Sequence, residues 1–199
     1  RIGPDYMEIG SFIGLAAATK GSITITGVEP RDLRPIKLAF KKLGIHWEIE
    51  GDALTVPMGQ SMQVDTDLGG MTPKIDDSPW PGFPADLTSV MTVVATQVSG
   101  TVLIFEKMFE SRMFFVDKLI GMGARITLCD PHRAVVSGPC RLHGVELVSP
   151  DVRAGMALVI AIGFIYLKEN KEKDTMTKLS MLGVRPRHIY LIHLITYSV

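Results

Sequence analysis

The chain has 199 residues, 46% of them hydrophobic, and its 21 lysines and arginines balance its 21 aspartates and glutamates. This size and composition are typical of a globular protein with a substantial core and exclude a disordered tail. The lack of net charge excludes the broad positive surface of a general nucleic-acid binder, so any anionic ligand must be held by local groups. We therefore expect no nucleic-acid partner.

No segment of the sequence predicts a membrane span. The longest apolar stretch, Met156 to Leu167, is shorter than the roughly 20 residues that cross a bilayer, and it favours a buried helix. With two cysteines and no basic-then-apolar leader, the chain is expected in a reducing cytoplasm. Because the sequence starts at Arg1 rather than at methionine, we expect it to be a segment of a longer protein.

Three stretches open with the same pattern, which indicates an internal repeat. The openings are Pro4-Asp5, Pro84-Ala85-Asp86 and Pro150-Asp151, and each precedes an apolar segment. Proline has no amide hydrogen to lose in the first turn of a helix, and aspartate complements the free amides there, so each opening predicts a helix start.

The first unit, residues 1–58, continues from this helix into a strand over Gly21 to Ile25. A second helix is predicted where apolar residues recur at three- and four-residue steps, and it ends at Gly44, where a left-handed C-cap suits a residue without a Cβ. The apolar residues are Leu33, Ile36, Phe40 and Leu43. Two short strands, 46–50 and 54–58, close the unit around a Gly51-Asp52 turn.

Residues 59–81 are rich in Gly, Pro and Asp without a clear period, so we expect a long loop of the functional or mobile kind. The second unit, residues 82–138, repeats the first, with a strand over Gly100 to Ile104 and a second helix that ends at Gly123. Its closing strands are predicted at 125–129 and 134–137. The third unit, residues 139–199, is shortened and divergent, since a charged run from Lys168 replaces the expected strand.

The predicted fold class is therefore α/β, with helices that pack together between sheets contributed by successive units. Four motifs then make the chain recognisable. They are Pro4-Asp5 with Glu8 and Gly10, Pro81 to Leu87, Phe105-Glu106 through Phe109-Glu110-Ser111-Arg112, and Asp151-Val152-Arg153-Ala154. In this order and spacing, over most of residues 1–161, they resemble the second half of the enolpyruvyl transferases that act on UDP-N-acetylglucosamine.

The resemblance implies one lobe of an inside-out α/β barrel, with substrates bound in a cleft between two lobes. It implies transfer of the enolpyruvyl group from phosphoenolpyruvate to a sugar hydroxyl of UDP-N-acetylglucosamine, the first committed step of peptidoglycan synthesis and so a contribution to cell-wall biogenesis, cell shape and division. The expected partners are these two substrates and a missing N-terminal lobe, with no cofactor. We expect the chain alone to be inactive.

The resemblance also assigns roles to particular residues. Asp86 matches the catalytic base and a sugar-hydroxyl contact, Met108 a backbone contact to the sugar nucleotide, and Arg153 a guanidinium that holds the enolpyruvyl donor. The simpler interpretation is that Asp86 only caps a helix and that Arg153 is an exposed charge or a partner of Asp151.

Asp151, Glu106 and Arg112 complete the expected substrate contacts, although charged turns are commonly solvated or internally paired. Cys129-x-x-His132 and Cys140-x-x-His143 contain zinc-ligand residue types, but an intervening strand gives no reason for the four side chains to converge. We therefore predict no metal site.

Two other functions remain open at this point. Enolpyruvyl transfer to shikimate phosphate uses the same fold and the same donor. The shortened third unit and the absent lobe also allow a non-catalytic binding module.

Overall fold

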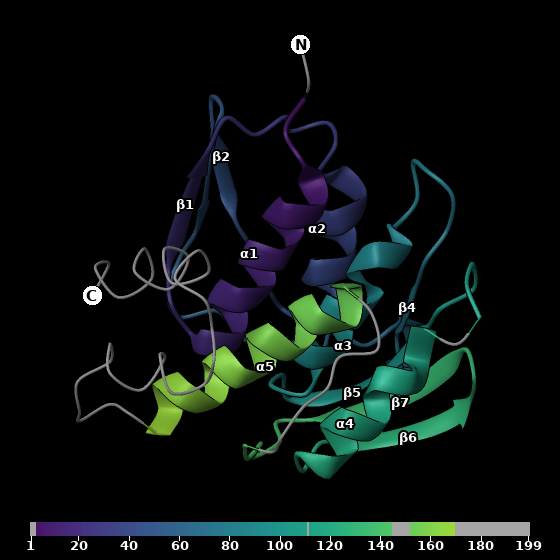
Figure 1. Cartoon of the computed structure of the whole chain (residues 1–199). Coiled ribbons are helices and arrows are strands. Elements are labelled where there is room, and N and C mark those ends of the chain that lie inside the picture. Colours follow the sequence, from purple (N-terminus) through teal and green to yellow (C-terminus); the bar gives the residue numbers. More distant parts are fainter. Residues whose placement is uncertain (1–2, 111, 145–151, 170–199) are drawn as a thin grey trace.

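The computed structural model describes residues 3–110, 112–144 and 152–169. Figure 1 shows two sheets on different sides of a group of helices, so the layers are sheet, helices and sheet. The first unit contains α1 (Tyr6–Thr19), β1 (Ile23–Thr26), α2 (Arg34–Lys41), β2 (Glu48–Glu50) and β3 (Ala53–Val56). Its three strands form an antiparallel sheet in the order β1-β3-β2.

The second unit supplies most of the second sheet. Its elements are η2 (Ala85–Leu87), α3 (Thr88–Ala95), β5 (Gly100–Phe105), η3 (Arg112–Phe115), α4 (Val116–Gly121), β6 (Arg125–Asp130) and β7 (Arg133–Gly138). The strand order is β4-β5-β7-β6, in which β4 runs parallel to β5 and the other neighbours are antiparallel. The helices and strands predicted for both units are confirmed, and their ends differ from the prediction by no more than three residues.

The segment 59–81 differs from the expected loop, because it contains η1 (Leu68–Gly70) and the strand β4 (Lys74–Asp76). A three-residue strand with one apolar side chain leaves no periodic signal in the sequence. Ile75 is only 3% exposed, and its strand forms by pairing with β5, which lies about 30 residues further along the chain. This pairing places the end of β4 beside the end of β5.

The predicted helix starts and ends follow the expected capping chemistry. The Asp5 carboxylate accepts hydrogen bonds from the amides of Met7 and Glu8, at 2.8 and 3.4 Å, and so caps α1. Gly44 has a φ of 68°, and a Cβ there would lie 2.6 Å from the Gln63 carbonyl oxygen. Glycine is therefore required after α2 for both conformation and space.

The third unit contributes α5 (Val152–Glu169), which confirms a helix over the apolar run from Met156. Residues 145–151 and 170–199 of this unit lie outside the described ranges. Among the described residues, no helix is long and apolar enough to cross a bilayer.

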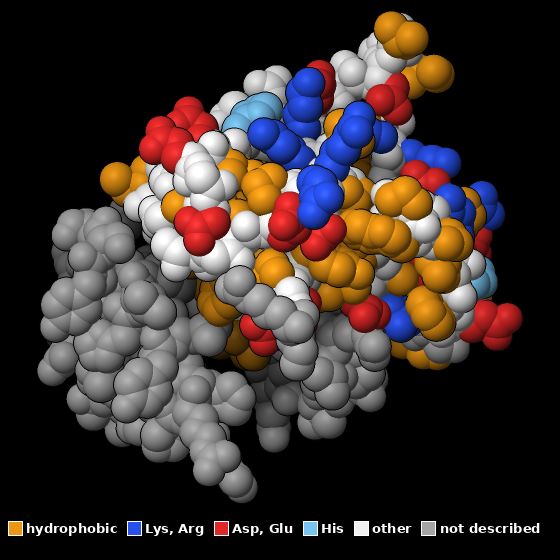
Figure 2. Space-filling model, turned by 90° about the horizontal axis from the view of Figure 1, so that it is seen from above, with side chains coloured by type: hydrophobic (Ala, Val, Ile, Leu, Met, Phe, Trp, Pro, Cys, Tyr) orange, Lys and Arg blue, Asp and Glu red, His pale blue; other side chains and the backbone are white. Residues whose placement is uncertain are grey.

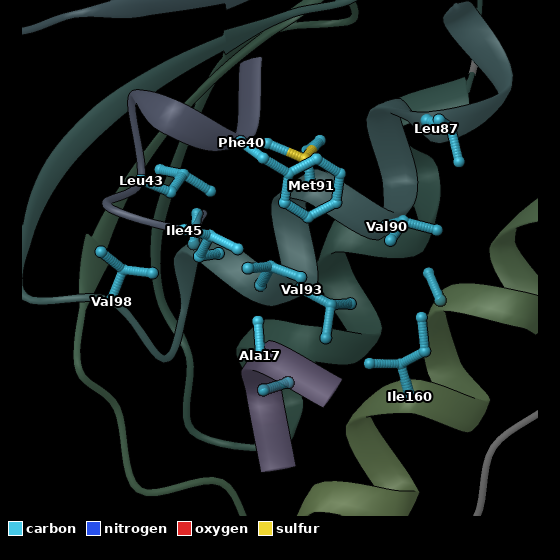
Figure 3. Close-up of a cluster of buried hydrophobic side chains, with 14 of the residues drawn as sticks. Ala17, Phe40, Leu43, Ile45, Leu87, Val90, Met91, Val93, Val98 and Ile160 are labelled. Carbon is cyan, nitrogen blue, oxygen red and sulfur yellow. The ribbon is translucent and has the colours of Figure 1, made fainter. Parts of the chain in front are cut away.

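The core lies where α1, α3 and α5 pack against one another. All eight residues of α3 are buried, so this helix is surrounded by other elements rather than exposing a polar face. Figure 3 shows side chains from α1, α2, α3 and α5 meeting in one cluster, with Phe40 beside Met91 and Ile160 reaching in from α5. On α1, Gly10 and Gly14 face Leu87 and Val90, which lets the helices approach closely.

We predict that Gly14→Ala destabilises the protein even though alanine favours helices. A Cβ at Gly14 would lie 2.7 Å from Val90 Cγ1 and 3.2 Å from Val94 Cγ2, and overpacking of this kind costs about 1–3 kcal/mol. The matched control is Gly121→Ala in α4, where nothing lies within 4 Å of the new Cβ.

In the control, alanine should be neutral or stabilising by up to about 1 kcal/mol. Chemical denaturation of both variants measures the two free energies of unfolding. A Gly14→Ala protein as stable as the Gly121→Ala protein would contradict the close helix packing.

Candidate functional site

The candidate site is built around Asp86, which lies in η2 immediately before the buried helix α3. Pro84 and Leu87 occupy the N-cap positions of η2 and α3, and neither makes a side-chain capping bond. Asp86 Oδ1 accepts a hydrogen bond from Arg112 Nη1 at 2.7 Å, which also makes an ion pair. Asp86 therefore lies at the start of a helix and also binds the guanidinium of Arg112.

Arg112 approaches Asp86 from η3, 26 residues further along the chain. Its guanidinium carbon lies 3.8 Å from the centre of the Phe109 ring, within the range of a cation–π contact. Both members of the ion pair are partly buried, with side chains 20% and 30% exposed. The Phe109 ring and the Asp86 carboxylate together fix the orientation of the Arg112 guanidinium.

The chain between β5 and η3, Glu106 to Arg112, is here called the 106–112 turn; Ser111 within it lies outside the described residues. Its backbone is held on one side by Asp77, whose carboxylate accepts hydrogen bonds from the amides of Lys107 and Met108. On the other side His132 holds it, since the Glu106 amide donates to the His132 carbonyl at 2.8 Å. A ring nitrogen of His132 lies 2.9 Å from the Glu106 carbonyl oxygen. The start of the turn is thus anchored on both sides by residues that lie just beyond the neighbouring strands β4 and β7.

Glu106 is a buried acid next to this anchor. Its side chain is 0% exposed, and neither carboxyl oxygen has a hydrogen-bond partner of good geometry among the described residues. Burial, followed by the nearby carboxylate of Asp77, raises the pKa of Glu106 from 4.5 to about 8, against weaker opposing effects of Thr88 and Arg112. Glu106 is therefore neutral at pH 7.

A second carboxylate, Asp76, lies at the surface one residue before the anchor. It pairs with Lys107 at 2.7 Å and with Lys74 at 3.2 Å. Burial opposes its ionisation, but hydrogen bonds to Lys107 and then Lys74 outweigh that effect and lower the pKa of Asp76. The two adjacent aspartates thus make different contacts: Asp76 binds lysine side chains, and Asp77 binds backbone amides.

The structure brings several of the expected site residues together. Asp86 and Arg112 are in direct contact, and Met108 lies on the same turn with 43% of its surface exposed. The Glu106 side chain, also expected at the site, is completely buried in the described part of the chain. Arg153 lies in the first turn of α5, but its side chain, like the whole of Asp151, lies outside what the structure describes.

Asp77 was not predicted from the sequence. Its only signal is that a second acidic residue follows Asp76 just before the Pro81–Leu87 motif, and an Asp-Asp pair alone is more typical of a solvated loop. Asp77 reaches the amides of Lys107 and Met108 only because β4 pairs with β5, and the sequence does not reveal this pairing.

Metal ligands do not gather in the part of the chain that the structure describes, where no three His, Cys, Asp or Glu side chains could hold one ion. Cys129 is exposed, whereas Cys140 is buried and its sulfur accepts a hydrogen bond from the Arg125 amide at 3.2 Å. The two Cys-x-x-His patterns therefore have ordinary structural environments.

A cavity of about 540 Å³ lies between α2 and the loop that leads to Asp86. Basic and aromatic side chains line it, namely Arg31, Arg34, Lys42, Lys74, Trp80 and Phe83. Three of the four cations already have partners: Arg31 pairs with Glu29, Lys74 with Asp76, and Lys42 donates to the Lys74 carbonyl. Figure 2 likewise shows lysine and arginine side chains gathered on one face with carboxylates among them, so the positive charge is locally offset.

Comparison with known proteins identifies the family. Residues 1–170 match the family model described as EPSP synthase (3-phosphoshikimate 1-carboxyvinyltransferase). The chain belongs to this family, and the resemblance deduced from its motifs is confirmed.

The curated relatives carry a more particular name. Proteins named UDP-N-acetylglucosamine 1-carboxyvinyltransferase from Treponema denticola and Treponema pallidum are 69% and 59% identical over 194 and 193 residues, covering 93% and 92% of this chain. One from Bradyrhizobium diazoefficiens is 56% identical over 161 residues, or 81% of the chain. The chain spans 46%, 45% and 37% of the lengths of these three relatives, so it corresponds to about half of each or less.

Solved structures agree on the fold. The enolpyruvyl transferase NikO from Streptomyces tendae matches 82% of this chain and 37% of its own with a TM-score of 0.66 at 21% identity. The EPSP synthase from Acinetobacter baumannii matches 80% of this chain and 36% of its own with a TM-score of 0.56 at 14% identity. The chain therefore has the α/β fold of the EPSP synthase family.

We predict that Glu106→Gln becomes more stable relative to the parent as pH rises from about 4.5 to 8. Below pH 4.5 Glu106 is protonated in both folded and unfolded states. Between 4.5 and about 8 only the unfolded state ionises, so the parent loses up to about 1.4 kcal/mol per pH unit, and above pH 8 the loss levels off. Glutamine does not titrate and lacks this loss.

Denaturant unfolding of parent and variant at pH 5, 6.5 and 8 gives the difference directly, and effects of other titrating groups cancel in it. A difference that stays constant with pH would show that Glu106 is already ionised in the folded protein.

Proposed function

We propose that this chain is one lobe of a two-lobed enzyme that transfers the enolpyruvyl group from phosphoenolpyruvate to the sugar hydroxyl of UDP-N-acetylglucosamine. The names of relatives that are up to 69% identical support this activity. The observation within the structure that carries the proposal is the Asp86–Arg112 pair beside the anchored 106–112 turn. A carboxylate and a guanidinium are thereby presented together at one edge of the lobe.

The transfer needs a base near the sugar hydroxyl and cations for the donor carboxylate and phosphate. In our proposal the Asp86 carboxylate accepts the hydroxyl proton while the sugar oxygen bonds to the enol carbon that carries the phosphate, and the methylene carbon takes a proton from the acid of the other lobe. Loss of a proton from the methyl carbon then forms the double bond again as phosphate leaves. Arg112 orients Asp86 and offers its remaining donors to the substrates. Met108 contributes its backbone to the binding of the sugar nucleotide.

The start of α5 provides the remaining contacts that we propose for this lobe. Arg153 lies in the first helical turn, and its planar guanidinium can bind the donor carboxylate or phosphate through two parallel hydrogen bonds. Asp151, just before the helix, is assigned to the same substrate-facing end. Glu106 supports the turn from inside instead of touching substrate, because its side chain is completely buried.

The wider setting is part of the same proposal. The second lobe closes the cleft and supplies the proton donor, and this lobe belongs to an inside-out α/β barrel. The reaction takes place in the cytoplasm, starts peptidoglycan synthesis and thereby serves cell shape and division. The chain alone turns over no substrate, because one side of a cleft neither encloses phosphoenolpyruvate nor supplies the missing acid.

The alternative acceptor is shikimate phosphate, which the description of the family model names. Equilibrium binding to the complete protein separates the possibilities, with each acceptor tested in the presence of phosphoenolpyruvate. We expect retention of UDP-N-acetylglucosamine and not of shikimate phosphate. The opposite preference would overturn the acceptor, and binding without phosphate release would favour a non-catalytic module.

We predict that Asp86→Asn in the complete enzyme lowers kcat by roughly 10²–10⁴-fold, the range typical of lost acid–base catalysis. Asparagine keeps the size of the side chain and can still accept a hydrogen bond from Arg112, so folding should survive. Asp52→Asn, in the exposed turn between β2 and β3, is the matched control and should behave as the parent.

Steady-state kinetics and thermal melts on the same preparations give both readouts. Near-parental turnover in Asp86→Asn would remove the assigned base. A lowered melting temperature with normal kinetics would show that Asp86 is structural.

We predict that Arg153→Lys raises KM for phosphoenolpyruvate much more than KM for the sugar nucleotide. Lysine keeps the charge but loses the two-pronged geometry that matches a carboxylate or phosphate. Arg125→Lys is the control, since Arg125 is exposed on β6 and donates to the Pro139 carbonyl. Equal increases in both KM values for Arg153→Lys would contradict the donor-binding role.

A further inference from the structure

The 106–112 turn begins where the second sheet loses one of its strands. The last pair in the register of β4 and β5 is Asp76 with Phe105, and the Asp77 amide then donates to the Phe105 carbonyl at 3.3 Å. Beyond this point β4 offers no further carbonyls in strand register. The amides of Lys107 and Met108 therefore need another acceptor.

The Asp77 carboxylate fills that need. One of its oxygens accepts from the Lys107 amide, and the other accepts from the Met108 amide at 3.0 Å. Asp77 is 0% exposed, so these are charge-assisted bonds shielded from water, a stronger class than bonds between neutral groups. Through them one side chain fixes two consecutive residues of the turn.

The groups around Asp77 add no second negative charge to the anchor. His132 satisfies the amide of Glu106 on the β7 side, and Lys107 directs its ammonium to Asp76 rather than to Asp77. The raised pKa of Glu106 leaves that residue neutral beside Asp77. A second negative charge here would repel Asp77 and loosen the turn.

We propose that Asp77 is a positioning residue that holds the backbone of the 106–112 turn in the shape that receives the sugar nucleotide. This inference rests on the proposed function, in which Met108 binds the sugar nucleotide through its backbone. It distinguishes the two substrates, because the amides that Asp77 binds belong to the part of the turn assigned to the acceptor, whereas donor binding is assigned to Arg153. Loss of the anchor should therefore weaken acceptor binding selectively.

The test compares Asp77→Asn with Asp76→Asn in the complete enzyme. Asparagine matches aspartate in shape but has no charge, and its NH2 group would face one of the two amides. Asp76→Asn removes the neighbouring charge and its surface ion pairs but leaves the backbone bonds of the turn intact. The two readouts are hydrogen exchange of the peptide that contains Lys107 and Met108, and the KM for each substrate.

For Asp77→Asn we expect exchange at the turn to rise about tenfold or more, and KM for UDP-N-acetylglucosamine to rise about 10- to 100-fold, as for loss of a charged hydrogen bond. KM for phosphoenolpyruvate should change by less than about threefold. Asp76→Asn should leave all three quantities close to the parent. Unchanged exchange at the turn, or an equal rise in both KM values, would overturn the proposal.

Asp77→Ser provides a second variant if Asp77→Asn does not fold, since it is smaller and retains one acceptor. Failure of both to fold would also overturn the proposal, because an anchor of one turn should not determine the whole fold. The exchange readout does not depend on the substrate. If the parent enzyme does not bind UDP-N-acetylglucosamine but Asp77→Asn still exchanges faster than the parent at the turn, the proposed function is rejected and the anchor is retained.

Discussion

Close packing of α1, α3 and α5 is the constraint on which the rest of the structure depends. These helices are apolar on nearly all sides, so each is stable only when the others and the two sheets cover it. The glycines of α1 let its backbone approach Leu87 and Val90, and this contact fixes the position of α3 along α1. Because η2 leads directly into α3, the same contact fixes the position of Asp86.

The second sheet positions Arg112 and the 106–112 turn, the other part of the site. Its central strand β5 ends beside β4, and the chain then turns back as η3 so that Arg112 reaches Asp86. The first residues of the turn between them are held in place, since their amides are bound by Asp77 and by the His132 carbonyl. The proposed base is thus held by a rigid helix on one side and by an anchored turn on the other, which is the arrangement that precise catalytic geometry requires.

Most of the architecture could be predicted from local signals. Pro4-Asp5 and Gly44 mark a helix start and a helix end by capping chemistry that involves only neighbouring residues. The strand β4 could not be predicted, because it is short and exists through a partner distant in sequence. Contacts between residues distant in sequence were missed for the same reason. Asp86 and Arg112 were both predicted as site residues, but their ion pair was not predicted, and neither was the burial of Asp77.

The most direct measurement is a crystal structure of the complete enzyme with UDP-N-acetylglucosamine bound. Our account predicts that a carboxylate oxygen of Asp86 lies about 2.6–3.2 Å from the reacting sugar hydroxyl, with the sugar nucleotide against the backbone of Met108. Asp77 should still hold the amides of the turn in that complex. A sugar hydroxyl directed away from Asp86 would contradict this assignment.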